Sequence, residues 1–404
     1  MNESDQAFLV TADFLGAKLC RDAIWAGNRC NWVGPATIDL RGGRQSAGHK
    51  ACGPDLFSGT AGIAIFLARL FAATGEKIFI LTAEGAIRQA LSRLDDFPPA
   101  IRIGFYTGLT GVAYVLAELA ELLSVDKFTA MAQLILEEVG KDDPEQHDLD
   151  VMSGSAGAIP VLLKIHRKQP QDFLLETAFR HGERLLTAAS TNDSRWTSAR
   201  TGFAHPQIGF AHGIDGIAWA LMELSHFTGR EGFRHAAEQC LRYQQSGFEN
   251  EEEDRSKVSG AAAESASWLR GASGVGMTRF RAFELLGDEI YLNQGKAALR
   301  TTLETLSESS SEAEQSDFSL AQGLTGSAEL LLYARHTLKD ESLDATAKKI
   351  GAQGIQRCAD LQWPCGAPGG AETPNLMLGL AGIGYFYLRL YDPIHTPSLL
   401  MVIP

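Results

Sequence analysis

Strongly apolar stretches recur along the chain, and each one follows a pair of glycines three residues apart. Each stretch is hydrophobic on almost every side, which is typical of a helix that is buried all round. Successive copies begin 46 to 59 residues apart, so the pattern predicts seven copies of one structural unit. The first glycines of the pairs are Gly59, Gly108, Gly154, Gly213, Gly271, Gly323 and Gly379.

The segments between these stretches are amphipathic and predict a second set of helices. In one of them the apolar residues fall at i, i+3, i+4, i+7 and i+8, with charged residues opposite. These apolar residues are Phe233, Ala236, Ala237, Cys240 and Leu241. Similar outer helices are predicted at about 5–24, 75–94, 126–141, 173–188, 286–306 and 339–360.

A repeated helical pair can form an open solenoid or a closed ring. The terminal repeats of a solenoid carry polar outer faces, whereas the last copy here, GLAGIGYFYLRL from Gly379, is as apolar as the middle copies. We therefore expect an all-α fold, an α/α toroid of seven inner and seven outer helices, formed by residues 1–404 as one domain. The glycines themselves are expected to allow tight turns into the inner helices.

In such a toroid the seven inner helices begin at one end. Their unpaired first-turn amides would give that end a positive potential suited to an anion. The residue before each glycine pair is expected to face this end, and these residues are Ser58, Thr107, Ser153, His212, Arg270, Gln322 and Leu378.

Three of the residues near this end suggest proton-transfer chemistry. His212 stands at a helix start, where a neutral or readily deprotonated imidazole suits a general acid or base. Asp150 and Arg270 would share its cavity, which makes all three candidate catalytic residues. Simpler roles remain open, because His212 can be a satisfied structural histidine, Asp150 a helix cap and Arg270 a solvated side chain. Thr107, Ser153, Gln322 and Trp268 are the predicted substrate-binding residues.

Composition narrows the class of protein further. Thirty-six Lys and Arg against 49 Asp and Glu give a net charge of −13, which argues against nucleic acid as a partner. The acidic start and the absence of any apolar run of roughly 18 residues predict neither a signal peptide nor a membrane span. Six dispersed cysteines without a CxxC pair predict reduced thiols and a cytoplasmic location.

Several strings resemble the lanthionine synthetase C-like family, most closely the cyclase domain of two-domain lanthipeptide synthetases. They are GPDLFSGTAGIAIFLARL (53–70), DVMSGSAG (150–157), GFAHGIDGIA (209–218), SWLRGASGVG (267–276) and WPCGAPGGAETPNLMLGLAGIGYFYLRL (363–390). The resemblance implies a double toroid. It also implies lanthipeptide chemistry, in which a peptide Cys thiol adds to dehydroalanine or dehydrobutyrine and closes a thioether ring.

The resemblance places the family's catalytic histidine on His212 and its conserved aspartate on Asp150. Its three zinc-ligand positions read Leu269, Ala321 and Gln322, so no metal and no other cofactor is expected. The cyclase domains of the kinase–cyclase class of lanthipeptide synthetases resemble this family without those ligands. The dehydratase domain of two-domain enzymes is also missing, so a separate dehydratase or kinase/lyase protein is expected to prepare the precursor peptide.

Two hypotheses follow from the sequence. In the first, a zinc-independent cyclase uses Arg270 and the helix starts to favour the substrate thiolate, His212 to transfer the proton and Asp150 to orient His212. In the second, the protein is a non-catalytic scaffold or partner subunit that binds a modified precursor peptide. A glycosidase on the same kind of toroid would need a carboxylate pair in the repeat turns, and no convincing pair is present.

Overall fold

The computed structural model of the protein describes residues 3–39, 45–191, 209–242, 266–309, 317–358 and 362–404. Within these residues seven inner helices each begin directly after the first glycine of a copy. They are α2 (Thr60–Thr74), α4 (Leu109–Leu123), α6 (Ser155–Lys168), α8 (Ile214–Thr228), α11 (Ala272–Leu286), α13 (Leu324–Leu338) and α15 (Leu380–Tyr391).

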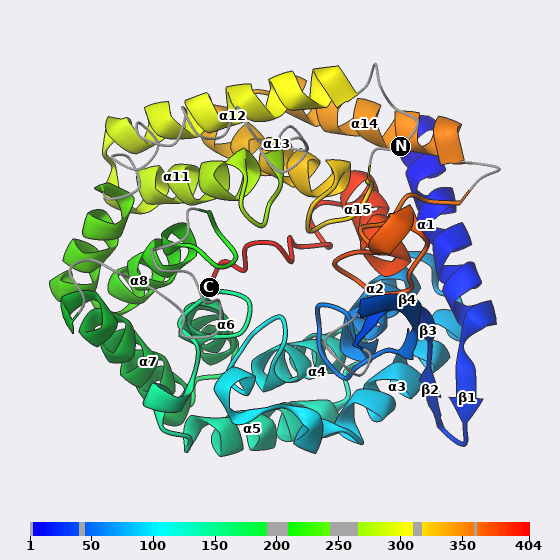
Figure 1. Cartoon of the computed structure of the whole chain (residues 1–404), viewed down its shortest axis with the longest axis horizontal. Helices are drawn as coiled ribbons and strands as arrows, with labels where there is room; N and C mark the ends of the chain where they lie inside the picture. Colours follow the sequence, from blue (N-terminus) through cyan, green and yellow to red (C-terminus); the bar gives the residue numbers. More distant parts are fainter. Residues whose placement is uncertain (1–2, 40–44, 192–208, 243–265, 310–316, 359–361) are drawn as a thin grey trace.

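Seven outer helices alternate with the inner ones along the described chain. They are α1 (Glu3–Asp22), α3 (Lys77–Leu91), α5 (Asp126–Gly140), α7 (Asp172–Thr191), residues 231–242, α12 (Glu289–Ser309) and α14 (Ser342–Cys358). The first outer helix, α1, packs on the last inner helix, α15, and α15 also packs on α2. These contacts close the ring that Figure 1 shows, so the predicted α/α toroid is confirmed.

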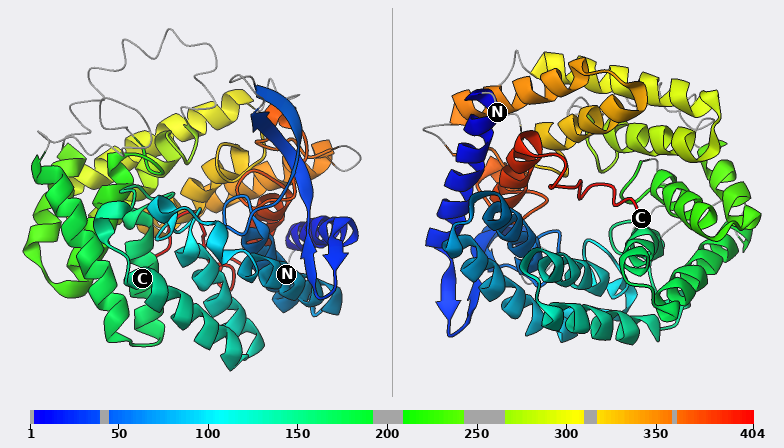
Figure 2. Two further views of the ribbon diagram at one scale, coloured as in Figure 1. Left: turned by 60° about the horizontal axis from the view of Figure 1, so that its bottom comes forward. Right: turned by 180° about the vertical axis from the view of Figure 1, so that it is seen from behind.

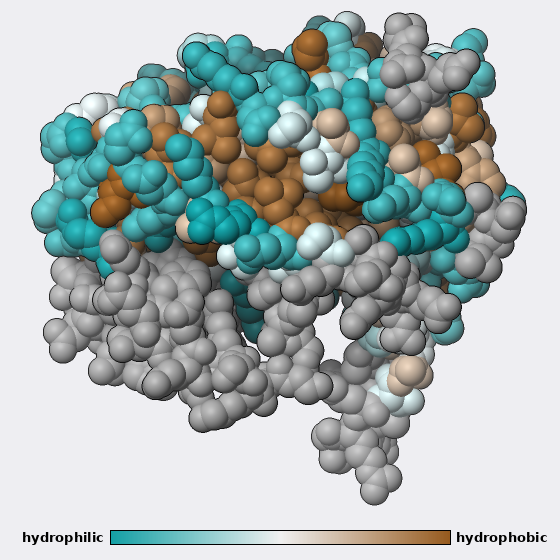
Figure 3. All heavy atoms as spheres, turned by 90° about the horizontal axis from the view of Figure 1, so that it is seen from above, coloured by the Kyte–Doolittle hydropathy of each residue, from teal (hydrophilic) through white to brown (hydrophobic). Residues whose placement is uncertain are grey.

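The amphipathic pattern predicts the burial of the outer helices correctly. In residues 231–242 the five apolar residues that define the predicted stripe are all buried, while Arg234 and Arg242 are exposed. Seen from the side of α12 and α14, the outer wall is largely hydrophilic, with an apolar area in the middle of the face (Figure 3). No helix in the described part of the chain is long and apolar enough to cross a membrane.

The second glycine of each pair is required by a close approach of the backbone. In all seven copies a Cβ at this position would overlap the carbonyl oxygen of the residue six positions earlier, as at Gly157 against Val151 and at Gly382 against Leu376. The backbone of the first glycine is extended in every copy, for example φ −124° at Gly154. The pattern therefore contains glycine because a side chain would not fit beside the neighbouring backbone, and not because the residue needs a positive φ.

A closed ring of backbone hydrogen bonds joins the seven turns. The second residue before each first glycine donates its N–H to the carbonyl of the equivalent residue in the next copy, and the seventh donates to the first. The donor–acceptor pairs are Phe57–Tyr106 (2.8 Å), Tyr106–Met152 (3.2 Å), Met152–Ala211 (3.2 Å), Ala211–Leu269 (3.0 Å), Leu269–Ala321 (3.3 Å), Ala321–Met377 (2.9 Å) and Met377–Phe57 (3.0 Å). All seven helix starts thus meet at one end of the toroid, as predicted.

The expectation of unpaired amides at this end is wrong for five of the copies. There the first residue of the inner helix donates its N–H to the carbonyl seven residues earlier, in the turn itself. The donors are Thr60, Leu109, Ser155, Leu324 and Leu380. The turn folds back over the helix start and satisfies amides that an open helix end would offer to an anion. The helix dipoles still direct their positive ends towards this face.

Two antiparallel hairpins were not predicted. β1 (Ile24–Ala26) pairs with β2 (Arg29–Asn31), and β3 (Val33–Asp39) pairs with β4 (Gln45–Ala51). The first hairpin lies against α3, where the Trp25 ring packs over Gly85 and Cys30 is buried. The second hairpin lies instead against the turn before α15, where Gly34 packs on Thr373 and Pro374, and it stands above the helices (Figure 2).

Ion pairs connect neighbouring inner helices away from the turns. Arg69 of α2 pairs with Glu118 of α4, Arg281 of α11 with Glu223 of α8 (2.6 Å), and Arg389 of α15 with Glu329 of α13 (2.5 Å). All three carboxylates are almost completely buried. Removal of one partner would leave a buried charge uncompensated, so these pairs fix which inner helices lie side by side.

We predict that the fold loses stability in mild acid because of buried histidines beside α6. His181 accepts or donates at Ser155 Oγ (2.9 Å), and burial lowers the pKa of His181 to about 3. Burial also lowers the pKa of the neighbouring His147. Below about pH 6.5 these histidines are protonated in the unfolded chain but stay neutral in the folded chain. Their titration therefore lowers the free energy of unfolding only below that pH. As the pH falls below this value, the free energy of unfolding drops by about 1.4 kcal/mol per pH unit for His181, and the lowered pKa of His147 adds a loss of the same sign.

Urea unfolding measured between pH 5 and 8 tests this prediction. His181→Gln should make the pH dependence shallower by one proton, whereas His235→Gln, at an exposed site, should leave it unchanged. Equal slopes in the two variants would contradict the assignment to His181.

Candidate functional site

His212 and Asp150 meet at the turn end of the toroid. His212 precedes α8 and Asp150 precedes α6, and the two neighbouring turns bring His212 Nδ1 to 2.7 Å from Asp150 Oδ2. The Asp150 side chain is 5% exposed and the His212 side chain 30%. A carboxylate only accepts hydrogen bonds, so Nδ1 carries a hydrogen, and in the neutral form of the ring the lone pair is on Nε2. The imidazole is therefore oriented by Asp150 and remains partly exposed.

The second oxygen of Asp150 has a separate, structural role. Its Oδ1 accepts the Ser153 N–H at 2.7 Å, which caps the turn rather than an amide of the helix. Asp55 accepts the Ser58 N–H in the first copy (2.7 Å) and Asn375 the Leu378 N–H in the last (2.9 Å) in the same manner. The structural and the functional roles predicted for Asp150 thus fall on different oxygens of one carboxylate.

Two further predicted residues lie next to this pair. Thr107 Oγ1 donates to Ser153 Oγ at 2.9 Å, and both side chains are half-buried. Ser153 is joined to Asp150 through its N–H, so hydrogen bonds connect Thr107, Ser153, Asp150 and His212 across three successive turns. The structure therefore brings these four predicted site residues together.

Arg270 and Gln322 occupy the equivalent position of their own turns and are exposed. The Arg270 backbone lies against Gly209, where an added Cβ would come 2.7 Å from the Arg270 Cα. The turns that carry Arg270 and His212 are thus in close contact. The guanidinium forms no hydrogen bond or ion pair with another described residue, and its role in catalysis stays a prediction.

Trp268 does not line the site, which corrects the prediction that it binds substrate. Its side chain is completely buried, its Nε1–H donates to the Leu400 carbonyl at 3.0 Å, and its ring contacts Tyr106 and Phe210. Trp268 is three residues before the glycine, and the side chain at that position points into the core rather than out of the turn. Trp268 therefore packs in the core on the inner side of the turns that form the site.

The three positions that hold zinc in the family do not fit a metal here. Leu269 and Ala321 have hydrocarbon side chains, and Gln322 offers only an amide, whereas structural and catalytic zinc sites use Cys, His and carboxylates. Within the described residues no cluster of three or more His, Cys, Asp or Glu side chains is arranged to hold a metal ion.

The chain's own cysteines are poor nucleophiles. All six are free thiols, and five of them are buried. Burial raises the pKa of Cys30, Cys52 and Cys365 to about 12 each, and raises that of Cys240 as well. A thiol that reacts at neutral pH near His212 would therefore come from a substrate.

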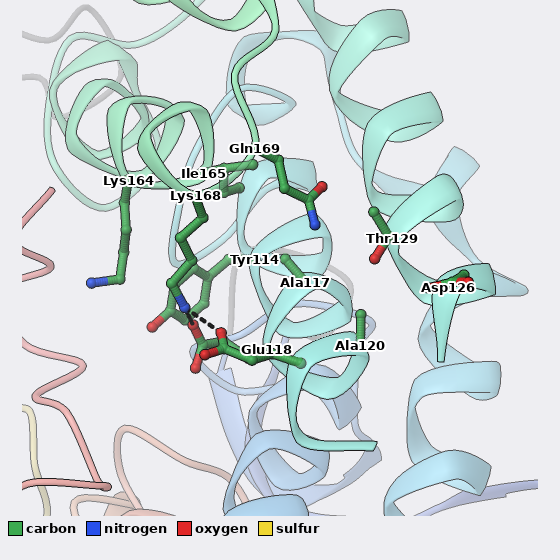
Figure 4. A pocket seen from close by; sticks show the side chains of 11 residues that line it. Tyr114, Ala117, Glu118, Ala120, Asp126, Thr129, Lys164, Ile165, Lys168 and Gln169 are labelled. Atoms are coloured by element: carbon green, nitrogen blue, oxygen red, sulfur yellow. Dashed lines mark hydrogen bonds and ion pairs between the residues drawn. The ribbon is translucent and has the colours of Figure 1, made fainter. Parts of the chain in front are cut away.

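A pocket of about 380 Å³ lies far from these residues, at the opposite ends of α4 and α6. Lys168 reaches Glu118 inside it, and Gln169, Thr129 and Asp126 line its other side (Figure 4). Glu118 also pairs with Arg69. The pocket contains ion pairs that join inner helices, and none of the predicted site residues lines it.

Sequence reasoning missed one residue that holds the turn of His212. Asp215, in the first turn of α8, is 1% exposed and accepts the Gly209 N–H at 3.3 Å. Arg279 of α11 pairs with the same carboxylate at 3.4 Å. The available signal was a charged residue inside the apolar stretch GIDGIAWALMEL that follows His212.

Comparisons with known proteins agree with this architecture. A protein-family model described as "Lanthionine synthetase C-like protein" matches residues 51–401. Among solved structures, a nisin cyclase aligns with a TM-score of 0.66 at 15% identity, covering 85% of this chain and 89% of that chain. A sugar epimerase from a ruminal bacterium reaches a TM-score of only 0.41 at 11% identity, covering 94% of this chain and 96% of that chain. No curated protein matches the sequence.

We predict that zinc binding can be installed by three substitutions. The Leu269 N–H donates to the Ala321 carbonyl at 3.3 Å, so the turns that carry the three zinc positions are neighbours. The combined variant Leu269→Cys, Ala321→Cys, Gln322→His should retain about one zinc ion per chain after dialysis, measured by atomic emission. Gln322→His alone is the control and should retain much less. A triple variant that holds no more zinc than the unaltered chain would show that the ring geometry differs from that required.

Proposed function

The chain belongs to the lanthionine synthetase C-like family, and on that premise we propose that it is a zinc-independent lanthionine cyclase. Its substrate would be a precursor peptide of a ribosomally synthesised lanthipeptide that carries Cys together with dehydroalanine or dehydrobutyrine. The reaction would be the addition of the Cys thiol to the double bond. The single observation that carries the proposal is the hydrogen-bonded His212–Asp150 pair at the turn end of the toroid.

Proton transfer by His212 accounts for the whole reaction. Nε2 of the neutral imidazole takes the thiol proton, and the sulfur forms a bond with the β-carbon of the dehydro residue. The electrons of the C=C bond move towards the neighbouring carbonyl as an enolate, and the imidazolium then returns the proton to the α-carbon. The net change is addition of S–H across the double bond, without any redox step. Asp150 holds the tautomer that leaves Nε2 free and stabilises the transient imidazolium.

Without zinc, the thiolate needs another source of stabilisation. Lowering a Cys pKa of about 8.5 by 1.5 units requires roughly 2 kcal/mol. The exposed guanidinium of Arg270, on the turn beside that of His212, and the positive ends of seven inner helices supply charge of the right sign. The thiolate would be stabilised by this charge and by the helix dipoles rather than by direct hydrogen bonds, because in five copies the first amide of the inner helix already donates to a carbonyl of its own turn.

The substrate is expected to approach from the turn face. The last segment of the chain lies within the ring (Figure 2) and bonds to Tyr106 and Trp268 on the inner side of the turns. Thr107 and Ser153 are linked to Asp150 by hydrogen bonds, and together with the exposed Gln322 of the sixth turn they would offer hydroxyl and amide groups to a peptide backbone. A separate dehydratase, or a kinase and lyase, would supply the dehydrated peptide, and the cytoplasm is the expected location.

One observation favours a second candidate function. The three zinc positions hold residues that cannot bind zinc, which is also expected of a non-catalytic relative that binds a modified peptide and serves other tailoring enzymes. Counting free thiols distinguishes the two. A dehydrated Cys-containing peptide is incubated with and without the protein, alkylated and analysed by mass spectrometry. Loss of thiols only in the presence of the protein supports a cyclase, whereas retained thiols with tight peptide binding support a scaffold.

We predict that His212→Ala blocks ring closure, with a fall in rate of roughly 100-fold to 10,000-fold, while peptide binding measured by fluorescence anisotropy is unchanged. Asp150→Asn should lower the rate as well but keep the fold, because Asn375 shows that an amide oxygen caps the same turn. The measurement is the time course of thiol loss.

Asp55→Asn is the matched control for this series. It makes the same change in the same position of the first turn, where the carboxylate accepts hydrogen bonds from the N–H and the hydroxyl of Ser58 and contacts no histidine among the described residues. Its rate should equal that of the unaltered protein. Full activity of His212→Ala would remove the proposal, and equal losses in both Asn variants would assign Asp150 a purely structural role.

A further inference from the structure

The last segment of the chain, residues 392–404, runs back through the centre of the ring after α15 (Figures 1 and 2). Leu399, Leu400, Met401 and Val402 are each at most 2% exposed. Side chains of three inner helices donate to its backbone carbonyls. These bonds run from Arg69 to His395 (2.8 Å), Arg389 to Thr396 (2.6 Å), Tyr385 to Pro397 (2.7 Å), Lys164 to Ile403 (2.9 Å) and Arg167 to Pro404 (3.0 Å).

Two more donors come from the turns that form the site. The Tyr106 hydroxyl donates to the Leu399 carbonyl at 2.7 Å, and the Trp268 Nε1–H donates to the Leu400 carbonyl at 3.0 Å. The rings of Tyr106 and Trp268 also contact each other, with centroids 5.2 Å apart. Consecutive carbonyls of one segment thus hold an aromatic pair that is completely buried.

This aromatic pair contacts the two turns that carry His212 and Asp150. Trp268 packs on Phe210 (5.5 Å), and its chain neighbour Leu269 accepts the N–H of Ala211, which precedes His212. Tyr106 donates its own N–H to Met152, two residues from Asp150. A shift of either aromatic ring would therefore move one of the two turns relative to the other.

We propose that residues 399–400, through Tyr106 and Trp268, act as a positioning floor that sets the geometry of the His212–Asp150 pair. This inference rests on the proposed function for its effect on rate. It assigns a purpose to the last segment other than filling space, because hydrocarbon side chains alone would fill the centre without fixing two neighbouring turns. Reacting groups displaced by about 1 Å can lose roughly 100-fold in rate, so a floor of this kind matters to catalysis.

The chain offers a matched pair of tyrosines to test the proposal. Tyr106 and Tyr385 are each 1% exposed, and each donates its hydroxyl to a carbonyl of the same segment at 2.7 Å. Only Tyr106 belongs to a turn of the site. Tyr106→Phe and Tyr385→Phe should lower Tm by similar amounts, because both lose one buried hydrogen bond. Only Tyr106→Phe should lower kcat for thiol addition, by roughly 10-fold, with KM unchanged.

A spectroscopic measurement keeps the test independent of activity. The ring-proton NMR signals of His212, assigned by comparison with His212→Ala, should shift in Tyr106→Phe and stay in place in Tyr385→Phe. Trp268→Phe breaks the neighbouring bond to Leu400 and should repeat the Tyr106→Phe result, and it replaces that variant if Tyr106→Phe does not fold.

Each outcome decides one question. Unchanged His212 signals in Tyr106→Phe, or equal changes in both tyrosine variants, would overturn the positioning floor. Absence of thiol addition by the unaltered protein would overturn the proposed function instead, and the NMR comparison would still decide whether the floor positions His212.

Discussion

Seven backbone hydrogen bonds, one between each pair of neighbouring turns, hold the ends of the inner helices together in a closed circle. Because the seventh turn, at Met377, bonds to the first, at Phe57, no turn is terminal and every turn has a partner on both sides. A single bond of this kind contributes about 1 kcal/mol, but closure makes the positions of all seven turns interdependent. The glycine pairs permit this arrangement, since a side chain at the second glycine would collide with the backbone that the ring requires.

The candidate site follows from this circle. The residue that follows each residue of this hydrogen-bonded circle is at the turn end of the toroid. Side chains from distant parts of the sequence therefore gather on that face. His212 and Asp150 come from neighbouring turns 62 residues apart and meet at 2.7 Å. Asp150 combines a structural and a functional contact. One of its oxygens caps the turn, as Asp55 and Asn375 do in their own turns, and the other accepts a hydrogen bond from the His212 imidazole.

The interior of the ring is organised differently from its face. Buried Arg–Glu pairs join neighbouring inner helices, and the last segment supplies carbonyl oxygens to the buried hydroxyl of Tyr106 and the buried Nε1–H of Trp268. Tyr106 and Trp268 connect this interior to the turns above it. The interior of the toroid and the turns at its face are thus joined by one set of contacts.

The sequence by itself determined the number of copies, the alternation of inner and outer helices, and the gathering of His212, Asp150, Ser153 and Thr107, because these follow from local periodicity and from equivalent positions in a repeat. It left the hairpins of residues 24–51 undetected, since short strands carry little periodic signal. Two expectations from the sequence were wrong, namely that Trp268 lines the site and that the first-turn amides of the inner helices are unpaired. Only the tertiary structure decided these points, because the direction of a side chain and the partner of an amide depend on how the turn folds back over its helix. The same holds for residues 392–404, whose acceptors meet their donors only after the ring has closed.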